Sequence, residues 1–123
     1  MTTILVVEDD PVIRENVTQL LGNQGYEIGQ ATDGVQALEM LKRRKFDLLL
    51  SDIVMPRMDG LTLIQHVRSS WPQTHIMVMT AYFQSASDTG FSVAGAEEFI
   101  RKPFLLDDLL SKVERVLQQP KTA

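Results

Sequence analysis

The order of apolar and polar residues along the chain predicts five short strands that alternate with helices. Runs dominated by apolar residues, each too short for a helix, occupy 4–7, 47–52 and 75–80. A run without polar alternation is typical of a strand that is covered on both faces. Two further short strands are expected at 26–31 and 98–101. Because strand and helix alternate five times, the pattern predicts an α/β fold in which helices cover both faces of a parallel sheet.

Between the strands, apolar residues recur at helical spacing, and polar residues mark where the helices begin. Asp10 and Asp59 are placed to cap two of these helices, and Asp33 opens a third. Leu105 stands where a polar cap is expected before the last helix. The segment 84–94 is rich in serine, threonine, aspartate and glycine, which have low helix propensity, so we expect a weak and mobile helix there.

Length and composition fit one globular domain. The chain has 123 residues, of which 44% are hydrophobic and 23% charged, so residues 1–119 are expected to form the domain and 120–123 a frayed tail. No apolar run approaches the roughly 20 residues of a membrane helix, and the N-terminus lacks the pattern of a signal peptide. A cytoplasmic protein that does not contact membranes is therefore expected.

Charge and cysteine content exclude some kinds of site. The chain has no cysteine, which excludes disulfides and thiolate metal sites. The net charge of −4 argues against direct nucleic-acid binding. Its one basic cluster, 42–45, is expected to complement a helix dipole and to stay solvated. His66 is expected to be solvated, His75 to lie at an edge, and Trp71 to pack in a loop.

Polar side chains stand at the ends of several predicted strands. Glu8 and Asp9 follow the first strand, Asp52 ends the third, Thr80 ends the fourth and Lys102 follows the fifth. Parallel strands place their carboxyl ends at one edge of a sheet, so these side chains converge if the first and third strands are neighbours. Carboxylates that are 4 Å apart repel by about 4 kcal/mol at an effective dielectric near 20. Oxygen ligands without histidine or cysteine indicate Mg²⁺ as the neutralising ion.

This combination is suited to phosphoryl transfer onto a carboxylate. Asp52 is placed to attack in line, while Lys102 and the metal ion neutralise the phosphoryl oxygens and Thr80 donates a hydrogen bond. Each residue taken alone also has a structural interpretation, such as a favourable charge at a helix start or a hydroxyl at a strand end. The occurrence of all of them at successive strand ends favours the functional interpretation.

The sequence resembles the receiver domain of two-component response regulators over almost its whole length. The motifs that carry the resemblance are ILVVEDDP, SDIVMPRMDG, MTA and GAEEFIRKPF. The resemblance implies a flavodoxin-like (βα)5 fold, doubly wound, with strand order 2-1-3-4-5. It also implies that the Lys102–Pro103 peptide bond is cis.

The same resemblance assigns roles to single residues. Asp52 matches the phosphoacceptor and Lys102 the phosphate-binding lysine. Asp9, Asp52 and the backbone carbonyl of Val54 match the ligands of Mg²⁺, and Glu8 would reach the ion through water. Thr80 and Phe99 match the switch pair, with phenylalanine in place of the tyrosine of many relatives.

The function that follows is a signalling domain rather than an enzyme. It would take a phosphoryl group from a phosphohistidine of a sensor histidine kinase or phosphotransfer protein, assist its own phosphorylation and dephosphorylation, and change the surface formed by 84–94, 98–101 and the last helix. That surface would meet an effector protein or an output domain. A phosphorylation-dependent dimer is compatible with the resemblance, but the last helix lacks the alternating charges that would predict its interface.

Other functions remain open at this point. The same domain could be a single-domain phosphorelay intermediate. A Mg²⁺-dependent phosphohydrolase with an aspartate nucleophile generally has a second aspartate two positions on, where this chain has Val54. A flavin-binding electron carrier needs a hydroxyl- and glycine-rich loop after the first strand, where the acidic residues 8–10 would repel a phosphate.

Overall fold

Five parallel strands form one sheet in a computed structural model that describes residues 1–53, 55, 57–81 and 96–120. The order across the sheet is β2-β1-β3-β4-β5, which confirms the predicted fold class and strand order. Val54 and the predicted helix at 84–94 lie outside the described residues. The strands are β1 (Thr3–Val7), β2 (Glu27–Ala31), β3 (Leu48–Asp52), β4 (His75–Thr80) and β5 (Glu98–Arg101).

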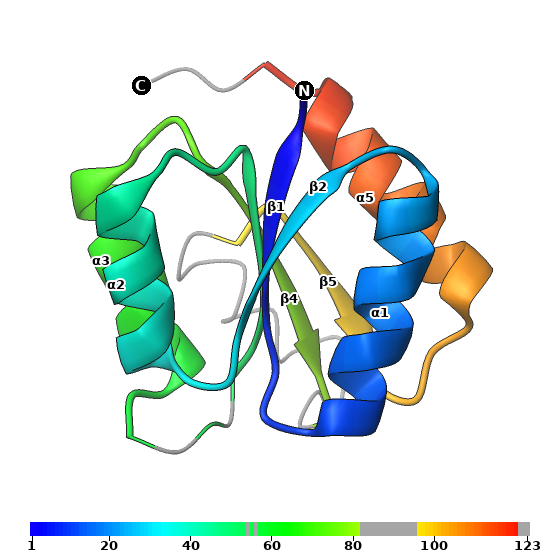
Figure 1. The fold of residues 1–123 in the computed structure, drawn as a ribbon, viewed down its shortest axis with the longest axis horizontal. Coiled ribbons are helices and arrows are strands. Elements are labelled where there is room, and N and C mark those ends of the chain that lie inside the picture. Colours follow the sequence, from blue (N-terminus) through cyan, green and yellow to red (C-terminus); the bar gives the residue numbers. More distant parts are fainter. Residues whose placement is uncertain (54, 56, 82–95, 121–123) are drawn as a thin grey trace.

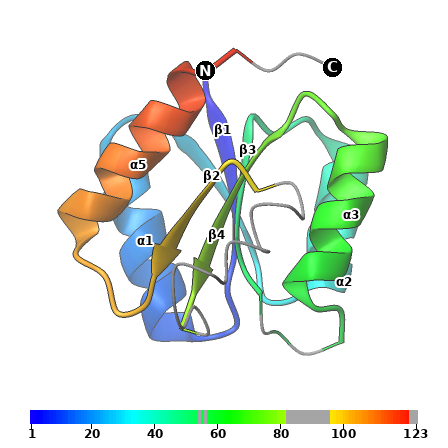
Figure 2. The ribbon, with the colours of Figure 1, turned by 180° about the vertical axis from the view of Figure 1, so that it is seen from behind.

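Helices cover both faces of this sheet (Figure 1). On one face lie α1 (Pro11–Asn23) and α5 (Leu106–Gln118), and on the other lie α2 (Gly34–Arg43) and α3 (Gly60–Ser70), as the reverse view in Figure 2 also shows. None of the helices in the described ranges is long and apolar enough to cross a membrane.

The helix starts follow from the local sequence. The carboxylates of Asp10, Asp33 and Asp59 accept hydrogen bonds from backbone N–H groups in the first turns of α1, α2 and α3. These bonds satisfy donors that have no partner within the helix. By contrast, α5 begins after Leu105 without a side-chain cap, as the sequence predicted.

The central strands are buried because their side chains alternate between two packed layers. In β1, Leu5 and Val7 join the cluster under α2 and α3, whereas Ile4 and Val6 join the cluster under α1 and α5. All five residues of β1 and of β3 are buried. This arrangement explains why these strands have apolar runs without polar alternation.

The environment of His75 corrects a prediction from the sequence. We expected His75 at an edge, but β4 lies between β3 and β5, and His75 is only 7% exposed. Its Nδ1 lies 2.6 Å from Oε2 of Glu97, a residue 22 positions away. The expectation was wrong because the burial of a strand's first residue depends on which strands lie on either side of it. The local sequence does not contain that information.

Candidate functional site

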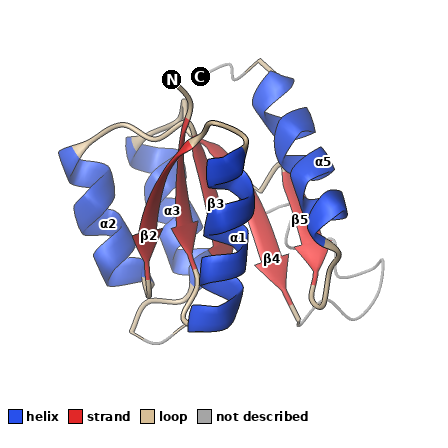
Figure 3. Ribbon diagram, turned by 45° about the vertical axis from the view of Figure 1, so that its right-hand side comes forward, coloured by secondary structure: helices blue, strands red, loops and turns tan. Residues whose placement is uncertain are grey.

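The parallel strands all point towards one edge of the sheet (Figure 3), and the predicted site residues end or follow these strands. Because β1 and β3 are neighbours, with Val7 opposite Ser51, the residues that follow β1 lie beside Asp52 at the end of β3. Thr80 ends β4 at the same edge. The first and third strands are therefore neighbours, which is the condition for the predicted site residues to lie close together.

Three carboxylates gather at this edge. One oxygen from each of Glu8, Asp9 and Asp52 lies within 4.8 Å of the others. Glu8 and Asp52 are buried, at 1% and 7% exposure, while Asp9 is exposed. The backbone around Glu8 is held by hydrogen bonds, because its N–H donates to Ala31 and its carbonyl accepts from Arg14 Nη1 at 2.8 Å. The backbone position of Glu8 is thus fixed by β2 and by α1.

Lys102 supplies positive charge to this cluster. Its Nζ donates to Oε1 of Glu8 at 2.5 Å and to Oδ2 of Asp52 at 2.8 Å. Burial alone would lower the pKa of Lys102, but the two carboxylates outweigh burial and raise the pKa above its ordinary value. Burial raises the pKa of Glu8 in spite of the opposing effect of Lys102. One ammonium group faces three carboxylates, so negative charge remains in excess.

This excess of carboxylate oxygen fits a hard divalent cation. Asp9 makes no ion pair with a described residue, and the lysine is paired with Oε1 of Glu8 and Oδ2 of Asp52. Carboxylate oxygens without nitrogen or sulfur donors are the set that Mg²⁺ prefers. Asp9, Asp52 and Glu8 are therefore the described residues that could hold it. The predicted carbonyl ligand, Val54, lies outside the described residues.

Thr80 and Phe99 lie on the paired strands β4 and β5. Thr80 is fully buried at the end of β4, and Phe99 is partly buried against the core under α2 and α3. Phe99 stands opposite Val78, two residues before Thr80. The Lys102–Pro103 peptide bond that follows β5 is cis, as the resemblance implied.

The first residue of α3, Gly60, lies against the end of β3. The N–H of Ile53 donates to Oδ1 of Asp52 at 2.6 Å, and the N–H of Gly60 donates to the carbonyl of Ile53 at 2.7 Å. A Cβ at position 60 would lie 2.3 Å from the carbonyl oxygen of Asp52. Only glycine allows α3 to begin this close to the end of β3.

An ion pair between this loop and α2 was not foreseen from the sequence. Arg57 has a φ of 69°, in the left-handed region, and its Nη2 lies 2.7 Å from Oδ2 of Asp33, the cap of α2. Side chains that are not glycine adopt this backbone conformation at a cost of roughly 1 kcal/mol or more. The ion pair and the hydrogen bond from Nε hold the Arg57 side chain beside the first turn of α2. In the sequence, the only indication of this ion pair was an arginine in a predicted turn. That arginine alone did not identify Asp33 as its partner.

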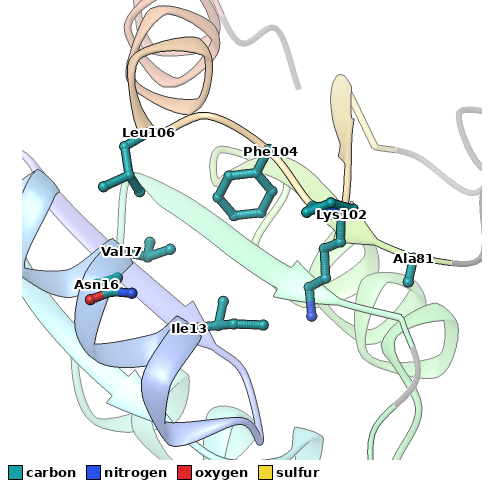
Figure 4. Close-up of a pocket in the computed structure, with 8 residues that line it drawn as sticks. Ile13, Asn16, Val17, Ala81, Lys102, Phe104 and Leu106 are labelled. Carbon is teal, nitrogen blue, oxygen red and sulfur yellow. The ribbon is translucent and has the colours of Figure 1, made fainter.

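A largely apolar pocket opens beside Lys102. Figure 4 shows Ile13, Asn16 and Val17 of α1 facing Phe104, which follows β5, and Leu106, the first residue of α5. Ala81, Lys102 and Pro103 complete the lining of this cavity of about 420 Å³. The charged site therefore continues into an apolar surface on the side of α1 and α5.

Fold and site together define a doubly wound α/β protein with an acidic, lysine-containing site at the carboxyl edge of its sheet. Residues 4–114 match the response regulator receiver domain family. The chain belongs to this family.

Relatives with similar sequences support the assignment to this family. The response regulator MprA of Mycobacterium leprae is 38% identical over 118 residues, and MprA of Mycobacterium tuberculosis is 36% identical. Each alignment covers 96% of this chain but 52% and 51% of the relatives, so the chain spans about half of their length. Identity over nearly the whole chain shows that the similarity is not confined to the motifs.

Solved structures agree in fold. The chemotaxis response regulator CheY4 of Vibrio cholerae aligns with a TM-score of 0.87 and 33% identity, covering 94% of this chain and 98% of that one. The response regulator TrrA of Thermotoga maritima, solved in complex with Mg²⁺-BeF, aligns with a TM-score of 0.84 and 38% identity, covering 94% and 99%.

Proposed function

We propose that this receiver domain is a phosphoacceptor that carries its phosphoryl group on Asp52. The observation that supports this most directly is the contact between Lys102 Nζ and Asp52 Oδ2 within a cluster of three carboxylates. The donor is a phosphohistidine on a sensor histidine kinase or phosphotransfer protein in the cytoplasm. The domain assists its own phosphorylation and dephosphorylation and is not a turnover enzyme for an independent substrate.

In the proposed transfer, an oxygen of Asp52 attacks phosphorus as the bond from phosphorus to the histidine nitrogen breaks. The electron pair of that bond stays on the imidazole, and Asp52 becomes a mixed anhydride. Mg²⁺ bound by Asp9 and Asp52, through water by Glu8, and by the Val54 carbonyl would offset the negative charge of the phosphoryl oxygens. Lys102, already oriented towards Asp52, binds one of these oxygens, and the buried Thr80 hydroxyl donates to another.

The pocket beside Lys102 gives the donor protein a place to bind. It lies between α1 and the start of α5, next to the site, and its lining is mostly apolar. Leu106 in this lining is 41% exposed, and Val12 and Leu105 next to lining residues are 65% and 70% exposed. Exposed apolar residues around a concave surface are typical of protein interaction sites. We place the helix that bears the phosphohistidine over this pocket.

The phosphoryl group would then change the surface that meets an effector protein or output domain. It adds about −1.5 to −2 charges and new acceptor oxygens. These would draw the Thr80 hydroxyl towards the phosphoryl group and leave space for the Phe99 ring. Because Phe99 lies on β5, the change would reach the surface of β5 and α5, together with residues 84–94, and could govern a phosphorylation-dependent dimer.

Incubation with acetyl phosphate and Mg²⁺, followed by intact mass measurement, tests the proposal. We expect a phosphoryl adduct on the wild-type protein and none on Asp52→Asn. The matched control is Asp108→Asn, an exposed residue of α5, which should form the adduct as the wild type does. An adduct on Asp52→Asn, or none on the wild type with and without Mg²⁺, would refute the proposed function.

A further inference from the structure

A second concave surface lies at the end of the sheet opposite to Asp52. Helices α2 and α3 both end there (Figures 1 and 3), and the ends of these helices and the residues that follow them line the surface. This surface, which we term the basic groove, is a cavity of about 480 Å³ lined by residues 41–45 and 70–74. It is separate from the site at the carboxyl edge, so both could be occupied at once.

The basic groove carries positive charge, although the protein as a whole has a negative net charge. Its lining contains four consecutive cationic residues, 42–45, and no acidic residue, whereas the whole chain carries a net charge of −4. Arg44 pairs with Glu27 at 2.8 Å and lies over the ring of Phe46. Lys42, Arg43 and Lys45 are exposed, and within the described ranges they have no carboxylate at ion-pair distance. Three positive charges are thus available to a partner.

The floor of the groove is fixed by hydrogen bonds. The backbone N–H of Trp71 donates to the carbonyl of Val67 at 2.7 Å. The partly buried side chain of Trp71 packs against the core under α2 and α3. Thr74 donates its hydroxyl to the carbonyl of Phe46 at 2.9 Å, which links the two walls. A partner would therefore meet a preformed surface with a tryptophan among exposed cations, and tryptophan and arginine are enriched at interaction hot spots.

We propose that the basic groove binds an acidic polypeptide segment of a partner protein. Carboxylates spaced along an extended chain match cations that are spread over four consecutive positions. Pairs between exposed side chains are individually weak, so the interaction should weaken as salt is added.

Fluorescence polarisation with a labelled peptide that alternates glutamate and leucine tests this proposal. We expect saturable binding by the wild-type domain at low salt, no binding of the same peptide with lysine in place of glutamate, and about tenfold weaker binding by Arg43→Glu. The variant Arg43→Gln should give a smaller loss. Arg101→Glu is the matched control, since Arg101 is exposed on β5 and the charge change is equal.

Trp71 provides a second readout that does not depend on a variant. It is the only tryptophan in the chain, so its emission should change as an unlabelled glutamate–leucine peptide saturates the groove. Thermal unfolding of each variant checks folding. Equal losses in Arg43→Glu and Arg101→Glu, unchanged Trp71 emission, or binding of ATP but not of the acidic peptide would overturn the proposal.

Discussion

The ammonium group of Lys102 lies 2.8 Å from Oδ2 of Asp52, although 50 positions separate the two residues in the sequence. The lysine follows β5 and the aspartate ends β3, and β4 lies between those strands. The long lysine side chain crosses this distance along the carboxyl edge of the sheet. It neutralises part of the charge that Asp52, Glu8 and Asp9 concentrate there.

Replacing this lysine should reveal the repulsion that it offsets. In Lys102→Met the side chain keeps a similar length, but Glu8 and Asp52 lose their buried cation. We expect a loss of about 3 kcal/mol in the free energy of unfolding without divalent ions, because breaking a buried ion pair leaves an uncompensated charge. Urea denaturation measures the loss. The loss in the free energy of unfolding should be smaller when Mg²⁺ is present. An equal loss with and without Mg²⁺ would contradict this explanation.

Mg²⁺ should stabilise the wild-type protein by binding the folded state. For a Kd of about 1 mM, roughly 10 mM Mg²⁺ adds about 1.4 kcal/mol to the free energy of unfolding. Asp9→Asn should remove most of this gain, because it deletes the exposed carboxylate of the cluster. Thermal unfolding with Mg²⁺, compared with the same ionic strength of sodium chloride, measures the gain. Equal stabilisation of Asp9→Asn by Mg²⁺ would place the ion elsewhere.

The Arg57–Asp33 ion pair should make stability depend on pH in the acidic range. Burial would raise the pKa of Asp33, but the hydrogen bond from Gln36 and the nearby Arg57 outweigh burial and lower the pKa below 3.8. A carboxylate with a lowered pKa in the folded state adds stability above the unfolded value, and this is lost as pH falls through the folded pKa. Asp33→Asn should therefore cost about 1 kcal/mol at neutral pH, and this cost should fall progressively as the pH drops below about 4.

Urea denaturation from about pH 7 to about pH 3 measures this difference. Asparagine is also a good N-cap, so Asp33→Asn keeps the cap of α2 and removes the ion pair with Arg57. Asp59→Asn provides the control, because Asp59 caps α3 through Thr62 without forming an ion pair with a described residue. A cost of Asp33→Asn that stays constant over this range would exclude the ion pair as its source.

Two glycines should respond to alanine in opposite directions. At Gly60 a Cβ would meet the backbone of Asp52 and Ile53, so Gly60→Ala should cost about 1–3 kcal/mol and lower the yield of the phosphoryl adduct. At Gly22, in α1, a Cβ would have nothing within 4 Å, and Gly22→Ala should stabilise by roughly 0.5–1 kcal/mol. Urea denaturation compares the two variants. A stabilising Gly60→Ala would refute the close approach of α3 to β3.

The proposed switch predicts a change in β5 that depends on a hydroxyl in β4. Hydrogen exchange of peptides that cover β5 and the start of α5 should differ with and without beryllofluoride in the wild-type protein. Thr80→Ala should suppress this difference, because the hydroxyl that follows the phosphoryl group is missing. Beryllofluoride must still bind to Thr80→Ala for the comparison to hold. An undiminished difference in that variant would remove Thr80 from the proposed switch.

Local sequence determined the elements and the residues at their ends. Apolar runs identified the strands because both faces of β1, β3 and β4 are covered, and aspartates identified three helix starts because a cap acts on the next few residues. The candidate site residues were named because each directly follows or ends a strand. The motifs of the receiver family then supplied the strand order, which the apolar pattern does not contain.

Only the tertiary structure decided which distant residues meet. The contact of His75 with Glu97, the Arg57–Asp33 pair and the groove between residues 41–45 and 70–74 each join segments that are far apart in the sequence. Hydrophobic periodicity and helix caps act over a few residues and specify a face or a boundary. Partners are chosen when strands pair and helices pack, because that step fixes which charges are brought together and which stay in water.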